Sequence, residues 1–335
     1  MTVTGEAPLV SVVLPAFDRA KTVGAAMGSV LRQTWRDLEL IVVDDGSADD
    51  TFEAARRVAD ARTRVIRSDA NLGAGAARNL GIAEARGQWV AFQDSDDEWL
   101  PLKLEKQMAR LLAPDAGYVG AYCGMAILGA PGAGRLRPRY FPGDDADLYE
   151  QDRLAMLLRR RLPWLARPRP AVLEGDLVAP LLRRSLISTQ TFVARRDLLR
   201  EVGGFDPGLR VMIDRDCALR LAARGPIAFV DEPLVLQWLS PNSISADRGR
   251  WLPSQIRLTE AHAALLERHP AAHAWLHYAI AGGQRRAGDL DAARAAIGRA
   301  CRLRPWSLRY RAMALGLRLR ALLAAAGGAS RRDGG

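Results

Sequence analysis

Short apolar runs alternate with helix-like patterns over the first 112 residues. The runs are rich in β-branched residues and end at proline, glycine or acidic residues, which is typical of buried strands; they span 9–15, 38–43, 64–66 and 88–92. The segments between them repeat apolar residues at helical spacing, and predict helices over about 20–33, 47–59, 76–85 and 101–112. In this pattern Ser47 caps the second helix and Pro101 lies near the start of the fourth. The alternation predicts right-handed βαβ units in a parallel α/β sheet.

The middle of the chain is less regular. Strands are predicted over 118–128, 188–194 and about 227–230, helices over 197–202 and 214–223, and a loop over 129–147. From about residue 251 the composition shifts to alanine, arginine and leucine with helical periodicity. Part of this region resembles a single tetratricopeptide hairpin, and one copy predicts helices that pack on a larger domain rather than a solenoid. We expect residues 327–335 to be disordered.

Acidic residues stand where two of the apolar runs end. Asp44 and Asp45 follow the second run, and Asp94, Asp96 and Asp97 follow the fourth. The ends of parallel strands meet at one edge of a sheet, where α/β proteins bind their ligands. Three carboxylates in four positions repel one another unless a cation is near, so the cluster favours a divalent metal site. The alternative is a set of acids before a helix, favoured by the helix dipole.

The charge of the chain is concentrated in its last quarter. The 335 residues carry a formal charge of +10, and residues 250–335 hold 15 arginines, no lysine and five acidic residues, which is the whole excess. Cys123, Cys217 and Cys301 have no metal-type spacing and predict buried thiols in a reducing compartment. The first eight residues lack a signal pattern, and no apolar stretch approaches the ~18 residues of a spanning helix. We expect a cytoplasmic protein, at most peripheral to a membrane.

An ordered set of motifs resembles the family 2 glycosyltransferases, whose nucleotide-diphospho-sugar fold is called GT-A. The motifs are SVVLPAFDR at 11–19, VDDGS at 43–47, NLG with AARN at 71–79, FQDSDDEW at 92–99 and GGFD at 203–206. The resemblance covers about residues 8–245, and implies a Rossmann-like mixed sheet with a nucleotide-binding half at 8–112 and an acceptor half at 113–245. A basic helical extension would then occupy residues 250–326.

The resemblance implies roles for the acidic residues at the strand ends. Asp94 and Asp96 form the DxD motif, in which Asp96 would hold Mg²⁺ or Mn²⁺ and Asp94 would face the ribose or donor sugar. Asp97 would be a more distant contact. Residues around the nucleoside, with the third loop and a phosphate contact from Arg78, complete the implied donor site: Pro15, Ala16, Asp18, Asp44, Asp45 and Gly73. For Arg78 a surface position on its helix is nearly as well supported by the pattern.

Asp214 and Asp216 compete for the role of catalytic base. Asp214 shares a helix face with Ala218, Leu221 and Ala222, so it would point into the domain, whereas Asp216 precedes Arg220 by four residues and predicts a surface ion pair. The family pattern also matches Asp214, which we therefore predict to be the base. The alternative role for Asp214 is that of a helix N-cap.

Two positions depart from the family pattern, and the tail adds two open questions. Ile213 stands where relatives often have Glu, and Ser240 stands where many have His. His269, His273 and His277, four residues apart, could hold a metal on one helix face, although a solvated face is favoured. The tail arginines, interleaved with leucines and Trp306, suit either a membrane surface or a solvated basic face, and nucleic acid less well.

The resemblance implies an inverting transfer of a sugar from a nucleoside diphosphate sugar, by default UDP-linked, to a hydroxyl of a sugar or lipid-linked acceptor. Such a reaction belongs to the synthesis of cell-surface glycans or glycoconjugates. The rival hypothesis is a non-catalytic protein that binds nucleotide sugars or acts as a scaffold through its helical tail.

Overall fold

The computed structural model describes residues 8–114, 116–128, 139–141, 173–238 and 248–329. The chain divides into two compact units. Unit 1 comprises Met1–Leu209 with Ile213–Ala246, and unit 2 comprises Arg210–Met212 with Asp247–Gly335.

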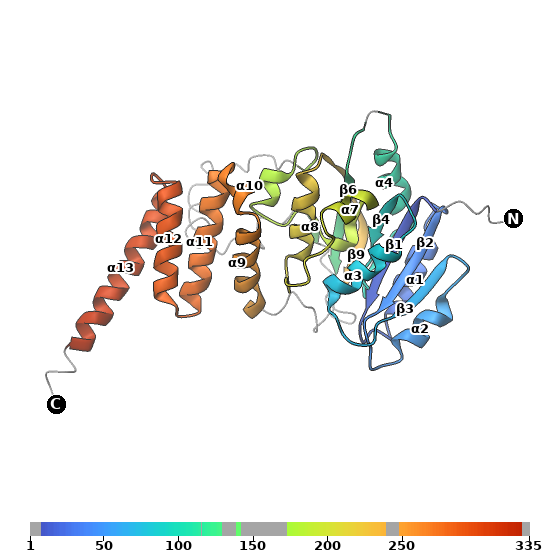
Figure 1. Ribbon diagram of the computed structural model, residues 1–335, viewed down its shortest axis with the longest axis horizontal. Helices are drawn as coiled ribbons and strands as arrows, with labels where there is room; N and C mark the ends of the chain where they lie inside the picture. Colours follow the sequence, from blue (N-terminus) through green and yellow to red (C-terminus); the bar gives the residue numbers. More distant parts are fainter. Residues whose placement is uncertain (1–7, 115, 129–138, 142–172, 239–247, 330–335) are drawn as a thin grey trace. The chain divides into compact units, whose positions relative to one another are not determined.

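Unit 1 is built on a nine-stranded mixed sheet with the strand order β3-β2-β1-β4-β8-β6-β9-β5, to which β7 adds beside β6 (Figure 1). The first four strands are parallel, as the sequence predicts. They are β1 (Val10–Ala16), β2 (Leu38–Asp44), β3 (Thr63–Arg67) and β4 (Trp89–Phe92). β8 (Phe192–Arg195) runs antiparallel to both of its neighbours, β4 and β6 (Gly120–Leu128). β9 (Ile227–Trp238) lies parallel to β6 and antiparallel to β5 (Glu98–Trp99).

Both faces of the parallel strands are covered, which explains why β1 and β2 are apolar almost throughout and buried along their whole length. One face packs on α1 (Val23–Leu31), α2 (Thr51–Val58) and α4 (Lys103–Leu111) in a single hydrophobic core. The other face carries α3 (Ala74–Glu84), where Gly81 allows close approach: an added Cβ would lie 2.3 Å from a methyl of Val13.

Several predicted boundaries are corrected. The helix predicted from Ser47 begins at Thr51, and the Ser47 hydroxyl instead accepts a hydrogen bond from the Asp18 N–H at 3.0 Å. The strand predicted over 188–194 opens with a 3₁₀ turn, η2 (Thr189–Thr191), before β8. β9 has 12 residues where the sequence predicts about four, because its second half pairs with β6 as far as Trp238 and with β5 at Val235 and Leu236.

Residues 173–238 also contain helices around the turn at residues 203–206. They are α6 (Val178–Leu181), absent from the sequence prediction, α7 (Arg196–Glu201) and α8 (Ile213–Ala222). Gly203 and Gly204 both have positive φ, which a glycine pair accepts without strain. Of the loop predicted over 129–147, only β7 (Arg139–Phe141) is among the described residues; the stretch around Ser240 lies outside them.

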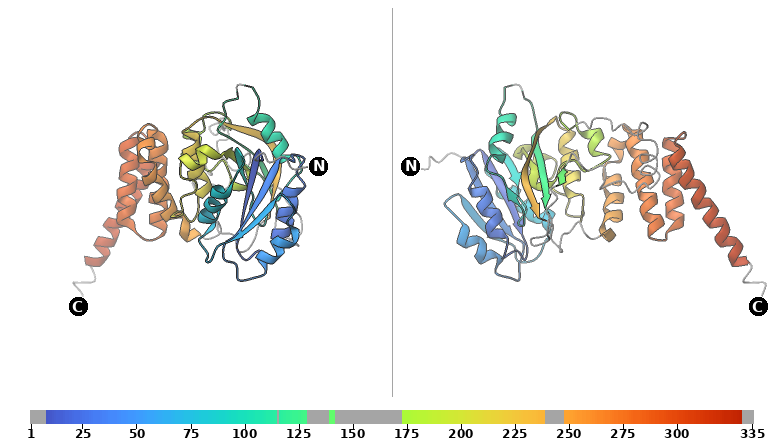
Figure 2. Two further views of the ribbon diagram at one scale, coloured as in Figure 1. Left: turned by 45° about the vertical axis from the view of Figure 1, so that its right-hand side comes forward. Right: turned by 180° about the vertical axis from the view of Figure 1, so that it is seen from behind.

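Unit 2 is helical, with η4 (Arg248–Arg250), α9 (Trp251–Ala261), α10 (Ala263–Glu267), α11 (Pro270–Arg286), α12 (Leu290–Leu303) and α13 (Leu308–Ala329). A three-residue connection makes α11 and α12 antiparallel neighbours (Figure 2). Asp289 caps α12 by accepting from the Ala292 N–H at 2.9 Å. α13 continues to Ala329, past the predicted helix end at 326, and residues 330–335 lie outside the described range. Among the helices described, none is both long and apolar enough to span a bilayer.

Glu39 supplies a test of how the first two strands are held. This buried carboxylate accepts from Ser11 Oγ at 2.6 Å, the Arg86 N–H at 2.8 Å and Arg64 Nη2 at 3.0 Å. Burial alone would raise the pKa of Glu39, but these hydrogen bonds and the Arg64 charge outweigh it and hold the pKa below its usual value.

We predict that Glu39→Gln lowers the free energy of unfolding at pH 7 by about 1–3 kcal/mol, the range for hydrogen bonds to a charged group. Because the folded pKa is depressed, this contribution is present above the unfolded pKa of 4.5 and is lost as pH falls through the folded value. Urea titrations of wild type and variant should therefore converge in acid. Glu53→Gln, at an exposed pair with Arg56, should change stability by less than about 1 kcal/mol at either pH; a Glu39 difference that persists in acid would contradict the assignment.

Candidate functional site

The three carboxylates after β4, Asp94, Asp96 and Asp97, each have a positively charged or hydrogen-bonding partner from a different element. Asp94 accepts from Arg78 Nη2 at 2.5 Å. Arg78 is a buried residue of α3, and its guanidinium also lies over the Phe205 ring, 5.6 Å from the centroid. Phe205 in turn meets Phe92 edge to face, with centroids 5.1 Å apart. The structure therefore places Arg78 inside the site, not on the surface of its helix.

Asp96 has a weaker partner. Its Oδ2 lies 3.6 Å from Nε of Arg19, in the loop after β1. Burial, followed by the negative charge of Asp94, raises the pKa of Asp96, although Arg19 and Arg78 oppose the shift. A raised pKa means that the ionised form lacks sufficient positive charge nearby. A cation bound beside Asp96 would supply it.

Asp97 belongs to the framework of the site. It is buried and accepts from Gln190 Nε2 at 2.9 Å and from the Trp238 N–H at 3.1 Å. Burial, then Asp94 and Asp96, raise its pKa well above the usual value. Its two hydrogen bonds connect the acidic segment to η2 and to the end of β9.

The acidic pair after β2 shapes the loop before α3. Asp45 is buried and accepts from the N–H groups of Leu72 at 2.9 Å and Gly73 at 2.8 Å. Asp44, fully buried, accepts from the Ser47 N–H at 3.2 Å, and its Oδ2 lies 3.2 Å from Nε of Arg67. The structure thus brings Asp44, Asp45 and Gly73 together as the sequence predicts.

Gly46 is required at the turn that follows. Its φ is +71°, and an added Cβ would lie 2.7 Å from the carbonyl carbon of Ala70. Any larger residue would push the loop at 70–73 away from Asp45.

The end of β1 lies beside this pair. Pro15 and Ala16 are buried, and the Ala16 carbonyl accepts from the Asp45 N–H at 2.8 Å. Asp18 is exposed, has a φ of +50°, and accepts from the Ala48 N–H at 2.9 Å. The left-handed backbone at Asp18 is a local strain in a non-glycine residue, and such positions cluster at functional sites.

Asp214 is a half-buried residue in the first turn of α8. Burial raises its pKa to about 6, even though the Arg215 N–H donates to it at 2.7 Å and Arg78 attracts it electrostatically. Asp94 adds to the increase. The electrostatic influence of Arg78 and Asp94 shows that α8 brings Asp214 to the same site as α3 and the end of β4.

The predicted surface position of Asp216 is wrong. Asp216 does pair with Arg220, but its side chain is buried, and Arg220 also donates to the carbonyls of Val202 and Gly204. α8 is buried continuously from Arg215 to Leu219, so its two faces cannot be distinguished by apolar spacing. The pair holds the 202–204 turn against α8.

Three residues of the site were given no role from the sequence: Arg19, Asn79 and Gln190. Asn79 Nδ2 donates to the Phe205 carbonyl at 2.7 Å, and Asn79 Oδ1 accepts from the Phe205 N–H at 2.8 Å. This double hydrogen bond fixes the ring against which Arg78 packs. The signal was present in the AARN motif, which places Asn79 directly after Arg78, but its partner is 126 residues away.

The residues present fit a divalent cation completed by its substrate. Within the described part of the chain, no group of three or more His, Cys, Asp or Glu side chains forms a metal site. Mg²⁺ and similar ions are commonly bound by one or two carboxylates together with substrate phosphates and water. Asp96, with its raised pKa, suits that arrangement, whereas Asp94 is already paired with Arg78.

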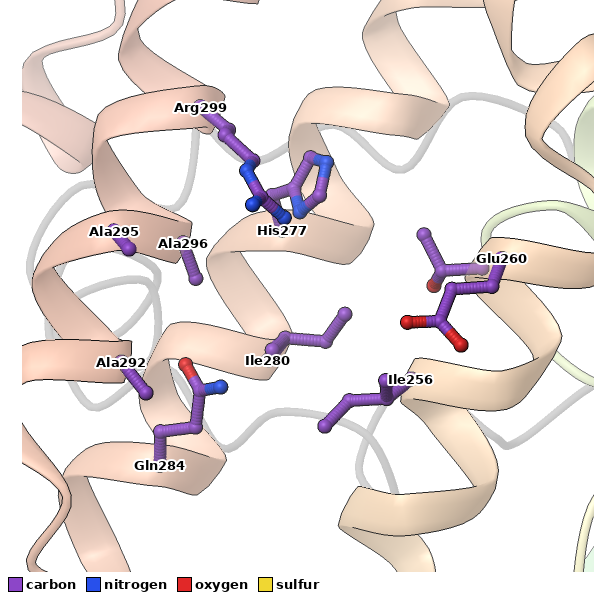
Figure 3. A pocket seen from close by; sticks show the side chains of 10 residues that line it. Ile256, Glu260, His277, Ile280, Gln284, Ala292, Ala295, Ala296 and Arg299 are labelled. Carbon is purple, nitrogen blue, oxygen red and sulfur yellow. The ribbon is translucent and has the colours of Figure 1, made fainter.

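The histidines of unit 2 lie elsewhere. His277 is buried and lines a pocket of about 260 Å³ between α9, α11 and α12, with Glu260, Gln284 and Arg299 (Figure 3). Its Nε2 lies 3.1 Å from Nε2 of His273, while His269 precedes the first turn of α11. Burial, then His273 and Arg299, lower the pKa of His277 to about 4. The prediction of a solvated face is therefore wrong for His277, and the nearby arginines disfavour a metal cation.

The mixed sheet and its acidic strand ends define a GT-A fold. Solved structures share it across nearly the whole chain at low sequence identity. The mannosyltransferase PcManGT from Pyrobaculum calidifontis, in complex with GDP-Man and Mn²⁺, aligns with a TM-score of 0.58 and 20% identity over 96% of this chain and 81% of its own. S. aureus TarS 1–349 in complex with UDP-GlcNAc gives a TM-score of 0.63 and 16% identity over 92% and 88%.

Residues 11–136 match the model of glycosyl transferase family 2, which confirms the resemblance over that segment. The glucosyltransferase WfgD of Escherichia coli, named for UDP-Glc and an α-D-GlcNAc-diphosphoundecaprenol acceptor, is 36% identical over 33% of this chain and 44% of its own length. The chain thus spans less than half of that relative. The uncharacterized protein MT1568 of Mycobacterium tuberculosis is 26% identical over 75% of this chain and 83% of its own length.

The buried Asp216–Arg220 pair gives a stability prediction. Asp216→Ala leaves Arg220 without its carboxylate, and should lower the free energy of unfolding by about 2–4 kcal/mol, somewhat below the range for fully buried pairs because Arg220 stays partly exposed. Denaturant titration measures the loss. Glu201→Ala, which breaks the exposed pair with Arg224, is the matched control and should cost less than about 1 kcal/mol. Equal losses in the two variants would show that Asp216 has no special structural role.

Proposed function

We propose that this protein transfers a sugar from a nucleoside diphosphate sugar to an acceptor hydroxyl, with inversion at the anomeric carbon. The observation that carries the proposal is the meeting of Arg78, Asp94, Asp96 and Asp214, which come from α3, the end of β4 and α8. Asp96 is a carboxylate suited to a metal cation, the buried Arg78 suits a phosphate, and Asp214 has a pKa of about 6. A purely structural cluster does not need this combination.

The donor would occupy the edge of the sheet between the ends of β1, β2 and β4. Asp44, Asp45 and Asp18, with the backbone of Pro15, Ala16 and Gly73, would surround the nucleoside. Asp96 would hold Mg²⁺ or Mn²⁺, which neutralises the charge that develops on the departing diphosphate, and Asp94 would face the ribose or the donor sugar. Arg78 would contribute a second positive charge beside Asp94. UDP is the default nucleotide, supported by the UDP-GlcNAc complex of TarS, while the GDP-Man complex of PcManGT keeps GDP open.

Asp214 would take the proton of the acceptor hydroxyl as its oxygen attacks the anomeric carbon opposite the diphosphate. The new glycosidic bond forms as the bond to the diphosphate oxygen breaks, and no covalent enzyme intermediate is needed. A pKa of about 6 leaves Asp214 ionised at neutral pH but more basic than an ordinary aspartate, which favours proton transfer.

The acceptor is proposed from the relatives. WfgD is named for a lipid-linked diphosphoundecaprenol acceptor, and the Bacillus subtilis relative TuaG, 35% identical over 37% of this chain, is a putative teichuronic acid biosynthesis glycosyltransferase. We therefore infer a sugar or lipid-linked acceptor in cell-surface glycan synthesis. Three unpaired cysteines suit a cytoplasmic location for the reaction, at the inner face of the membrane where the acceptor is lipid-linked.

A non-catalytic nucleotide-sugar-binding or scaffold protein is the second candidate. The observation that favours it is the pair of departures at Ile213, directly before the proposed base, and Ser240. The two hypotheses share the donor site and differ in whether a sugar is transferred.

We predict that Asp214→Asn lowers the transfer rate by about 10²–10⁴, because it removes the proton acceptor while keeping the size of the side chain. Donor affinity, measured by calorimetry, should stay within a few-fold. In wild type the rate should rise with pH through about 6, as Asp214 loses its proton, and this limb should disappear in the variant. Wild-type pH dependence in Asp214→Asn would place the base elsewhere.

A thermal-shift screen of nucleotide sugars with Mn²⁺ tests the donor site. A donor present at 100 times its dissociation constant should stabilise the wild-type protein by about 2.7 kcal/mol. Asp96→Ala should lose most of the metal-dependent part of this shift. Binding of a donor without hydrolysis or transfer would favour the scaffold hypothesis, and the absence of any shift across the screen would refute the nucleotide-sugar site.

A further inference from the structure

The outer side of α13 carries an apolar stripe. Leu308, Leu315 and Leu319 follow one another at intervals of seven and four residues, with Ala312 between them, so they share one face of the helix. Their side chains are exposed, by 82% for Leu308, 59% for Leu315 and 51% for Leu319. Trp306, just before the helix, is 85% exposed. Isolated exposed leucines are common, but a continuous stripe with a tryptophan at its end is not.

Arginines border this stripe on both sides. Arg311 and Arg318, seven residues apart, lie along one edge, and Arg320 lies along the other. Arg309 shares the edge of Arg320, but its guanidinium lies over the rings of Tyr278 and Tyr310, 5.2 and 5.4 Å from their centroids. The guanidinium of Arg311 lies over the Trp306 ring, 5.4 Å from the centroid. From 308 to 329 the sequence contains these four arginines and no acidic residue.

The opposite side of α13 is committed to packing within unit 2. Tyr310 and Leu317 are buried in the core formed with α11 and α12, and the Tyr310 ring lies 5.1 Å from that of Tyr278. This packing fixes the rotation of the helix about its axis. The leucine stripe is therefore held outward by the fold of unit 2.

We propose that the outer face of α13, defined by Trp306, Leu308, Leu315, Leu319 and the bordering arginines Arg311, Arg318 and Arg320, binds the surface of a bilayer that contains anionic lipids. A helix that lies in the membrane interface needs an apolar stripe to enter the acyl boundary, cationic side chains at both edges to reach phosphate groups, and an aromatic ring at headgroup depth. All three are present on one face.

Other occupants fit this face less well. A nucleic acid would use the arginines but gains nothing from leucines between them. A second copy of the chain would bring arginine rows of the same sign together around the leucines. The proposal is independent of the donor site and adds to the proposed function a surface on which a lipid-linked acceptor would be met.

Sedimentation of the full chain with vesicles tests the proposal. Vesicles of phosphatidylcholine with 30% phosphatidylglycerol should bind the protein, and vesicles of phosphatidylcholine alone should bind it at least tenfold more weakly. The double variant Arg311→Gln/Arg318→Gln should lose about 25-fold in affinity for the anionic vesicles, since each arginine near such a surface contributes roughly a fivefold factor. Leu315→Gln/Leu319→Gln should lose at least tenfold.

The matched control is Arg285→Gln/Arg286→Gln, which removes the same charge from exposed positions on α11. It should bind like wild type. A second readout is the quenching of tryptophan fluorescence by brominated lipid. This quenching should be weaker in Trp306→Phe than in the wild-type protein. Unfolding of any variant is detected by its thermal melt, and the quenching experiment then decides alone.

Four results would overturn the proposal: equal binding to neutral and anionic vesicles, equal losses in the α13 and α11 arginine variants, tighter binding to a short RNA than to vesicles, or a dimer that dissociates in Leu315→Gln/Leu319→Gln. Donor binding by thermal shift is measured in parallel. If the wild-type protein binds the donor but not the vesicles, the proposal for α13 fails and the proposed function stands. If it binds the vesicles but not the donor, the proposed function fails and the proposal for α13 stands.

Discussion

The repulsion among three carboxylates in four positions governs the organisation of unit 1. Asp94 is neutralised by Arg78 from α3, Asp96 is approached by Arg19 from the loop after β1, and Asp97 is held by Gln190 and the Trp238 N–H. Each partner comes from a different element. The chain can place such a cluster at a strand end only when these elements are in position, so the charges and the packing of the site require each other.

The parts of the fold that depend on local pattern could be predicted from the sequence. The parallel strands β1 to β4 were visible as β-branched runs, and their acidic ends marked the edge where the site forms. What could not be predicted depends on distant partners. β9 extends to Trp238 because β6 and β5 lie beside it. Ser47 does not cap a helix, because its hydroxyl accepts a hydrogen bond from the Asp18 N–H.

The two aspartates of α8 show the limit of apolar spacing as a guide. That argument assumes a helix with one buried and one solvated face, and α8 is buried on both. Asp214 and Asp216 are separated instead by their neighbours: Arg78 and Asp94 lie within electrostatic reach of the first, and Arg220 pairs with the second. The tail arginines are likewise distinguished by their neighbours, since Arg299 lines the pocket beside His277 whereas Arg311 and Arg318 flank the exposed leucines of α13.

The five residues between β4 and β5, Gln93–Asp97, form a short segment that is fixed at both ends. Where this segment leaves β4, the Gln93 N–H donates to the Val13 carbonyl at 3.0 Å. The side-chain amide of Gln93 donates to the Asp97 carbonyl at 2.7 Å, and β5 pairs with β9 at the other end of the segment. The conformational entropy of this segment is therefore lost when the protein folds, not when a ligand arrives. An inserted residue would lengthen a segment whose two ends are held in place by these contacts. This segment is therefore one of the places in the chain least able to vary in length.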